Sequence, residues 1–224
     1  MITVHHLNNS RSQRVLWLLE ELGLPYEIKH YQRDAKTSLA PPELRKVHPL
    51  GKSPVITDSG LTVAESGAIL EYLVDRYGQG RLKPTAEQDL LHYRYFMHFA
   101  EGSAMPPLVM KLVFNKVKRS PMPFFIKPIA KGIADKVMKG FVQPNIDAQL
   151  KFVEAELSAR PWFAGDEFTA ADVQMSFAAE AWAARGGPDL KATYPKLTQF
   201  LARIHARPAY QRALERGGPY ALMS

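Results

Sequence analysis

The segment Ser53-Pro54-Val55-Ile56-Thr57-Asp58-Ser59-Gly60-Leu61-Thr62-Val63-Ala64, residues 53–64, decides the fold of the first third of this chain. Two short strand-like runs, 54–57 and 61–64, flank the polar tripeptide 58–60. Glycine adopts a positive φ without strain, so Gly60 suits the end of a three-residue hairpin loop. The segment therefore predicts a β-hairpin that closes a sheet.

The residues before the hairpin alternate between strand and helix patterns. Ile2–Leu7 predicts a short strand, and apolar residues at i, i+3, i+4 and i+7 over 15–22 predict a helix that ends at Gly23. Tyr26–Tyr31 predicts a second strand, and the run Pro41-Pro42-Glu43 predicts the first turn of a short helix. Strand, helix and strand in succession form a βαβ pattern.

The sequence pattern changes after residue 78. An apolar helical stripe over 70–77 ends at Gly78, and the rest of the chain shows long amphipathic stretches with aromatic and methionine residues instead of strand patterns. We expect an α/β domain of order βαβ-ββα over residues 1–78, a linker over 79–84, and an all-α helical bundle domain over 85–224.

Composition excludes several classes of protein. The 224 residues are 46% hydrophobic and 23% charged, which argues against disordered and fibrous chains. The sequence contains no cysteine, which excludes disulfide frameworks, thiolate metal sites, iron–sulfur clusters and a cysteine nucleophile. Any thiol chemistry must therefore use the sulfur of a substrate.

The sequence also lacks membrane and secretion signals. No run approaches the roughly 18 consecutive apolar residues that a membrane span needs, and Met1–Leu7 lacks the regions of a signal peptide. We therefore expect a cytoplasmic protein with no membrane partner.

Positive charge is concentrated in one segment. The chain has a net charge of +7, and residues 111–139 hold eight basic side chains against one acid, an excess equal to that of the whole chain. Such a stripe could attract anionic ligands, nucleic acid or a membrane surface, but we expect a solvated helical face with extended cationic side chains. The basic residues are Lys111, Lys116, Lys118, Arg119, Lys127, Lys131, Lys136 and Lys139, and the acid is Asp135.

Several catalytic motifs are missing. Gly51-Lys52-Ser53 is similar to the end of a phosphate-binding loop, but Lys46 stands where that motif needs its first glycine. The chain has no G-x-G-x-x-G, H-E-x-x-H or G-x-S-x-G sequence, which argues against a dinucleotide site, a metal site and a serine hydrolase.

Four motifs in order are similar to those of a known family: His6-Leu7-Asn8-Asn9-Ser10-Arg11-Ser12-Gln13-Arg14 leading into 16–21, then 48–55, 64–69 and 169–172. Over essentially its whole length the chain resembles the cytosolic glutathione S-transferases, in the bacterial and fungal subgroup with a serine-type N-terminal motif. The resemblance implies a thioredoxin-like N-terminal domain, glutathione as co-substrate, no metal, a role in detoxification, a cis Ser53–Pro54 peptide bond and a homodimer.

The physical chemistry of these motifs suits the parts of glutathione. Glu65 and Ser66 stand where a strand turns into a helix, so Ser66 can hold the γ-glutamyl carboxylate and Glu65 the ammonium. Either residue could instead simply cap that helix. A cis bond between Ser53 and Pro54 would turn the Val55 backbone outward, where it can pair with the cysteinyl unit. His48 and Lys52 suit the glycyl carboxylate, although Lys52 could also be a solvated loop residue.

The loop after the first strand is where the family carries a hydroxyl that activates the thiol. Ungapped counting gives this position to Asn9, but we favour Ser10 because a hydroxyl is the better donor to sulfur. Asn9, Arg11 and Ser12 stay as alternatives, and Ser10 and Ser12 could also cap the following helix. Thr169 and Asp172 have the spacing of a capping box.

We therefore expect an enzyme that conjugates the glutathione thiolate to an electrophilic small molecule. Peroxide or disulfide-bond reduction would use the same glutathione sulfur. The alternative is a non-catalytic adaptor of the same fold in a protein or nucleic-acid assembly, although nucleic acid is not the partner we expect. An acceptor pocket between the domains would be lined from the second one by residues near Tyr93, Phe96, Met97, Glu101, Met105 and Pro106, most of which we expect to belong to the core or a dimer contact.

Overall fold

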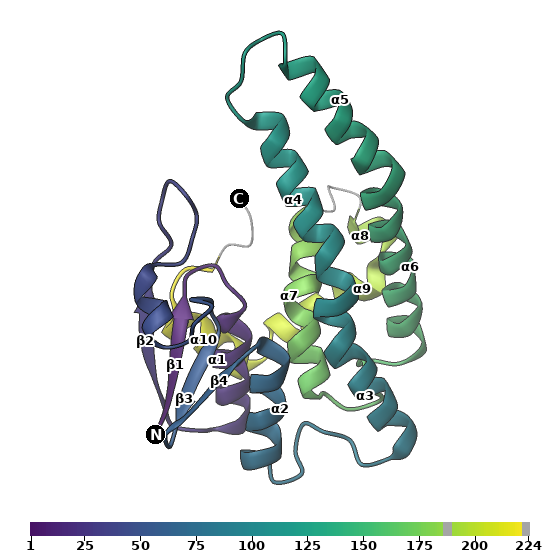
Figure 1. The fold of residues 1–224 in the computed structure, drawn as a ribbon. Helices are drawn as coiled ribbons and strands as arrows, with labels where there is room; N and C mark the ends of the chain where they lie inside the picture. Colours follow the sequence, from purple (N-terminus) through teal and green to yellow (C-terminus); the bar gives the residue numbers. More distant parts are fainter. Residues whose placement is uncertain (186–189, 221–224) are drawn as a thin grey trace.

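The N-terminal part is a four-stranded mixed sheet with helices, as expected. The computed structural model describes residues 1–185 and 190–220. The sheet order is β2-β1-β3-β4, with β1 parallel to β2 and antiparallel to β3, and β3 antiparallel to β4 (Figure 1). The elements are β1 (Ile2–Leu7), α1 (Ser12–Leu22), β2 (Tyr26–Tyr31), the 3-10 helix η1 (Pro42–Lys46), β3 (Val55–Asp58), β4 (Leu61–Ala64) and α2 (Ser66–Tyr77). The predicted βαβ-ββα order is confirmed.

The apolar periodicity explains why α1 packs on the sheet. Val15, Leu18 and Leu19 are fully buried, and each buried leucine contributes roughly 1.5–3 kcal/mol to folding. The helix ends at Gly23, whose φ is 68°, with backbone bonds from Gly23 N–H to the Glu20 oxygen and from Leu24 N–H to the Leu19 oxygen. This is a Schellman cap, which needs a left-handed residue and therefore favours glycine.

The hairpin turn is shorter than the sequence predicts. Asp58 pairs with Leu61, so the loop holds two residues, Ser59 and Gly60, both with positive φ. Asp58 stays in the strand because its buried carboxylate accepts hydrogen bonds from Tyr72 and Tyr77 of α2 and from Ser59. Burial opposes ionisation, but these bonds outweigh it and lower the pKa of Asp58. The predicted three-residue loop is wrong, because the contact with α2 extends the strand by one residue.

The second part is helical, as expected. Within the described residues it holds a single isolated β-bridge, between Trp162 and Gly165. Its elements are α3 (Glu87–Phe99), the π-helical turn η2 (Ala100–Ala104), α4 (Met105–Arg119), α5 (Lys127–Val137), the π-helical turn η3 (Met138–Val142), α6 (Gln143–Ala159), α7 (Ala170–Arg185), α8 (Leu190–Thr193), α9 (Pro195–His205) and α10 (Pro208–Gly217). Helices α4 and α5 form a long hairpin that projects from the rest of the molecule (Figure 1).

The two parts share one apolar core. Helix α7 packs against α1, α2 and α3, and α10 returns to pack along α1. Trp17 of α1 lies edge-on to Tyr210 of α10, with ring centroids 5.2 Å apart. Because the core is continuous, the division at residues 79–84 stays a prediction.

The start of α7 is held by a buried acidic cap. The Asp172 carboxylate accepts hydrogen bonds from the backbone N–H groups of Thr169 (2.8 Å) and Phe163 (2.9 Å). The Thr169 hydroxyl oxygen accepts the N–H of Ala171 at 3.2 Å. These reciprocal bonds confirm the predicted capping box, and the bond to Phe163 also joins the preceding loop to the helix.

Replacing Asp172 by Ala is expected to lower the free energy of unfolding by roughly 2 to 4 kcal/mol, because two buried N–H groups lose their acceptor. Thr169→Ala removes one acceptor and should lower it by about 1 kcal/mol. Urea denaturation of the wild type and both variants measures the difference. A loss for Asp172→Ala no larger than that for Thr169→Ala would contradict this role of the carboxylate.

Candidate functional site

One cavity gathers most of the residues that the sequence marks as ligand contacts. Its volume is about 230 Å³, and it lies where the loop after β1, the loop before β3, the β4–α2 junction and η2 meet. The lining residues are Arg11, His48, Leu50, Lys52, Ser53, Pro54, Ala64, Glu65, Ser66 and Glu101. The fold therefore brings together His48, Lys52, Ser53, Pro54, Glu65 and Ser66, which are separated by up to 18 positions in the chain.

The β4–α2 junction offers backbone donors to the cavity. Glu65 has a φ of 73°, an uncommon value for a non-glycine residue, and α2 begins at the buried Ser66. Within the described part of the chain, Glu65 makes no side-chain capping hydrogen bond. The N–H groups of the first turn of α2 are therefore left for an anion at the positive end of the helix.

Ser53, in the loop before β3, lines the cavity, whereas Val55 lies within the strand. The Ser53–Pro54 peptide bond is cis, as the resemblance implies, and the Ser53 hydroxyl donates to the His5 carbonyl oxygen at 2.8 Å. Ser53 lines the cavity, whereas Val55 is buried in β3, where it pairs with His5 on one side and Ala64 on the other. The residue of this pair that borders the cavity is thus Ser53, two positions before Val55.

The hydroxyls of Ser10 and Ser12 are turned into the protein. The two oxygens lie 2.7 Å apart, and the Ser10 oxygen accepts the N–H of Ser12, the first residue of α1, at 3.2 Å. The Ser12 oxygen also lies 2.9 Å from Nδ1 of the buried His6. Burial, with the nearby His30 adding to it, lowers the pKa of His6 to about 4, so this ring is neutral at pH 7. Asn9, with φ of 49°, is exposed.

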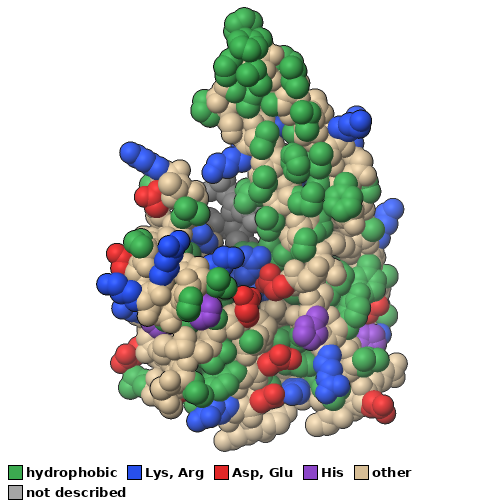
Figure 2. All heavy atoms as spheres, in the orientation of Figure 1, with side chains coloured by type: hydrophobic (Ala, Val, Ile, Leu, Met, Phe, Trp, Pro, Cys, Tyr) green, Lys and Arg blue, Asp and Glu red, His purple; other side chains and the backbone are tan. Residues whose placement is uncertain are grey.

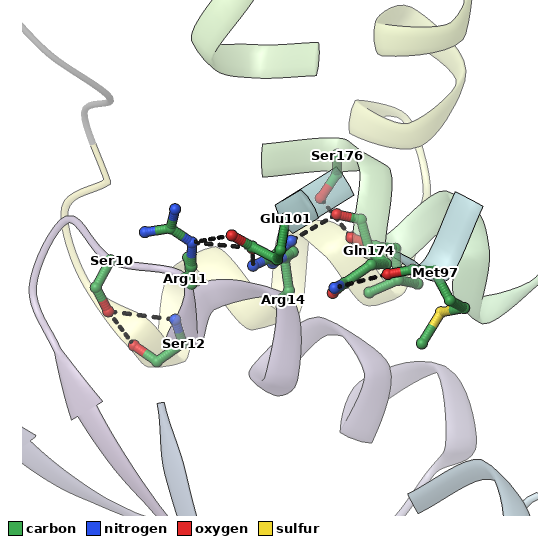
Figure 3. Close-up of polar contacts among 9 residues, drawn as sticks. Ser10, Arg11, Ser12, Arg14, Met97, Glu101, Gln174 and Ser176 are labelled. Carbon is green, nitrogen blue, oxygen red and sulfur yellow. Dashed lines mark hydrogen bonds and ion pairs between the residues drawn. The ribbon is translucent and has the colours of Figure 1, made fainter. Parts of the chain in front are cut away.

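Arg11 is the residue of this loop that faces the cavity, and a carboxylate of the helical part holds it there (Figure 3). Its Nε lies 2.9 and 3.0 Å from the two Glu101 oxygens. Glu101 also accepts from Arg14, a nearly fully buried guanidinium that donates to the Gln174 carbonyl oxygen as well. Both guanidinium groups lie over the Phe177 ring, 4.9 and 5.3 Å from its centroid.

Charge balance at this wall of the cavity is positive, because two guanidinium groups share one carboxylate. Burial opposes ionisation of Glu101, but Arg14 and Arg11 outweigh it and lower the pKa of the carboxyl.

Sequence reasoning named Glu101 only as one residue near an acceptor pocket and gave Arg14 no role. Tyr93, Phe96, Met97 and Met105 from the same set are buried in the core. No local signal could have selected Glu101, since its partners stand about ninety positions away.

The donor set suits a zwitterionic organic ligand. Arg11 and Lys52 supply cations and Glu65 an anion around one small cavity, with helix N–H groups beside them. In the part of the chain that the structure describes, no group of three or more histidine, aspartate or glutamate side chains is placed to hold a metal ion.

Comparison with known proteins matches both parts of the chain. Residues 1–75 match the family described as glutathione S-transferase, N-terminal domain, and residues 107–208 match the corresponding C-terminal domain. The chain is 38% identical over 219 residues to glutathione S-transferase 3 of Schizosaccharomyces pombe, covering 96% of this chain and 88% of the relative. It is 35% identical over 226 residues to glutathione S-transferase 1 of Saccharomyces cerevisiae, covering 96% and 95%.

Solved structures of glutathione transferases have the same fold as this chain. A glutathione S-transferase from Actinobacillus pleuropneumoniae superposes with a TM-score of 0.78 at 32% identity, covering 100% of this chain and 95% of the other. A glutathione transferase family member from Pseudomonas fluorescens with two glutathione bound gives a TM-score of 0.76 at 27% identity, covering 96% and 92%. Family models match both parts of the chain, and two relatives are more than 30% identical to it over 96% of its length. The chain therefore belongs to the glutathione S-transferase family.

Proposed function

We propose that this protein binds glutathione in the cavity between β1, β3 and α2 and transfers its thiolate to an electrophilic small molecule. The observation that carries the proposal is the convergence of Lys52, Ser53, Glu65 and Ser66 with Arg11 on one cavity. Their charges complement a peptide with an ammonium group, two carboxylates and a thiol. Glutathione is a cytosolic thiol, so we propose a cytoplasmic enzyme of detoxification.

Each end of glutathione has a chemically matched group. The γ-glutamyl carboxylate would bind the N–H groups at the start of α2 and the Ser66 hydroxyl, while Glu65 would pair with the ammonium. The glycyl carboxylate would lie near Lys52 and His48. The cysteinyl unit would pair with the backbone at Ser53, rather than at Val55, because Ser53 borders the cavity.

We propose Arg11, rather than Ser10, as the group that activates the thiol. A cation beside sulfur favours the thiolate and lowers its pKa. Arg11 borders the cavity and is oriented by Glu101, whereas the hydroxyl oxygens of Ser10 and Ser12 are engaged at the start of α1. Thiolate formation in a fixed position would then let the sulfur attack a substrate carbon and expel its leaving group.

We also propose a homodimer whose interface includes exposed apolar side chains of α3 and of β4. Leu91 and Tyr95 of α3 are 67% and 48% exposed, and Leu61 of β4 is 49% exposed. Leu91 and Tyr95 border two adjoining apolar hollows of about 300 and 610 Å³. A second copy of the chain would remove these side chains from water.

Replacing Ser66 by Ala is expected to weaken glutathione binding at least tenfold, because the carboxylate loses a hydroxyl donor at the helix start; tenfold corresponds to about 1.4 kcal/mol. Isothermal titration calorimetry measures the affinity. Ser158→Ala, on the exposed side of α6, is the matched control and should bind as the wild type does. An unchanged affinity of Ser66→Ala, with unchanged melting temperature, would contradict the proposed carboxylate site.

Replacing Arg11 by Gln should raise the apparent pKa of the bound glutathione thiol and reduce turnover of an aromatic halide at least tenfold at neutral pH. The loss should shrink at high pH, where the thiol ionises without help. Ser10→Ala should leave the apparent pKa unchanged. The measurement is the pH profile of kcat/KM for each variant. A shifted profile for Ser10→Ala alone would return the role to Ser10.

Replacing Leu91 by Glu should convert the proposed dimer to a monomer, because two charges would be buried in an apolar contact. Sedimentation equilibrium of the wild type and the variant gives the two masses. Leu39→Glu, at an equally exposed leucine in the loop between β2 and η1, is the control and should keep the wild-type mass. A monomeric wild type at micromolar concentration would rule out the dimer.

A further inference from the structure

The hairpin of α4 and α5 ends in a cluster of exposed apolar side chains. Phe124 and Phe125, in the loop between the helices, are 86% and 63% exposed, and their rings contact each other edge-on with centroids 5.6 Å apart. Ile126, Ile129 and Ile133 follow at i, i+3 and i+7 and are 42%, 63% and 59% exposed. Ile126 directly precedes α5, and the spacing places Ile129 and Ile133 on one face of that helix. We call these five residues the apolar tip.

The apolar tip is not explained by packing within the chain. Figure 2 shows hydrophobic side chains gathered at the free end of the hairpin, away from the body of the molecule. Ala134 of α5 is buried, whereas the larger isoleucines of the same helix face outward. Soluble proteins seldom expose several large apolar side chains together unless they contact a partner.

Cationic residues flank the apolar tip in the chain. Lys127 and Lys131 on α5 and Lys116 and Arg119 at the end of α4 are exposed. Asp135 is the sole acid in residues 111–139, and its carboxylate forms an ion pair with Lys118. The segment therefore keeps the positive excess that makes up the net charge of the chain, and it carries that excess next to exposed phenylalanine and isoleucine.

We propose that the apolar tip docks on an anionic lipid surface, with Phe124, Phe125 and Ile126 inserted at the interface and the flanking lysine and arginine side chains at the headgroups. Apolar side chains next to a basic rim are the composition of interfacial membrane anchors. Among the residues that the structure describes, no helix combines the length and apolar character needed to cross a membrane, so the contact would be at the surface.

Two other partners for the apolar tip, a second copy of the chain and a nucleic acid, fit its side chains less well. A second copy of the chain would bring two strongly positive segments together, and like charges repel. A nucleic acid would satisfy the cations, but the isoleucine face of α5 offers its phosphates no partner. An anionic bilayer satisfies both the cations and the apolar side chains. The proposal therefore departs from the expectation, drawn from the sequence, of a solvated face with no membrane partner, because the structure exposes the apolar tip.

Docking at the tip would leave the glutathione cavity accessible. Helix α4 starts next to the η2 turn that carries Glu101 and runs 15 residues toward the tip, a rise of about 22 Å. The enzyme could therefore act on apolar electrophiles dissolved in the membrane, a consequence that rests on the proposed function. The docking itself does not depend on glutathione binding, so the two proposals fail separately.

The test is co-sedimentation with vesicles of phosphatidylcholine alone or mixed with phosphatidylglycerol. The wild type should bind the mixed vesicles, bind neutral vesicles at least tenfold more weakly, and lose affinity as salt rises. Phe124→Ser/Phe125→Ser and Lys127→Glu/Lys131→Glu should each reduce binding to the mixed vesicles at least tenfold. Leu39→Ser and Lys36→Glu/Lys46→Glu, which change exposed residues elsewhere, should bind as the wild type does.

A second measurement tests insertion directly. Phe125→Trp places a fourth indole in the chain, at the tip. When mixed vesicles are added, its emission after subtraction of the wild-type signal should shift to the blue and be quenched by brominated lipid. Absence of wild-type binding to mixed vesicles, or full binding by the double phenylalanine variant, would overturn the proposal. So would retention on duplex DNA at physiological salt with the same sensitivity to both double variants, or a dimer that dissociates in the phenylalanine variant.

Discussion

The buried guanidinium of Arg14 is the interaction on which the arrangement of the two parts depends. A buried cation must be paired, and removing one partner of such a pair costs roughly 3–5 kcal/mol. Arg14 of α1 finds its partners in the helical part: the Glu101 carboxylate from η2 and the Gln174 carbonyl oxygen from α7 (Figure 3). These three elements must therefore meet, and their meeting point forms one wall of the cavity.

The same carboxylate links domain packing to the chemistry of the site. Glu101 binds Arg14 on its buried side and Arg11 on the cavity side, so the orientation of the cavity cation depends on how the helices dock. A second set of pairs supports this docking, with Arg207 bound to Glu21 and Arg216 to Glu20 at the contact of α10 with α1. A site built in this way is lost when the helical part moves away from the sheet.

Within the described residues, the far end of the hairpin of α4 and α5 is not held by contacts of this kind. Met105 and Leu108 at the start of α4 belong to the shared core, whereas the apolar tip at the far end of the hairpin is exposed. This separation lets one chain carry a polar, charged cavity at the junction of its parts and an apolar, cationic surface at its far end.

Local sequence pattern was sufficient to predict much of the secondary structure of this protein. Periodicity located the strands and helices of the first part, Gly23 marked the end of α1, and the Thr169–Asp172 spacing identified the cap of α7, because each depends on neighbours within a few positions. Tertiary structure decided what depends on distant partners. Tyr72 and Tyr77 keep Asp58 in its strand and shorten the turn. Strand pairing on both sides of β3 buries Val55. Glu101 turns Arg11 toward the cavity, while the Ser10 hydroxyl oxygen accepts a hydrogen bond at the start of α1. The sequence likewise showed the charge of residues 111–139, but only the packing of α5 revealed which of its apolar side chains face water.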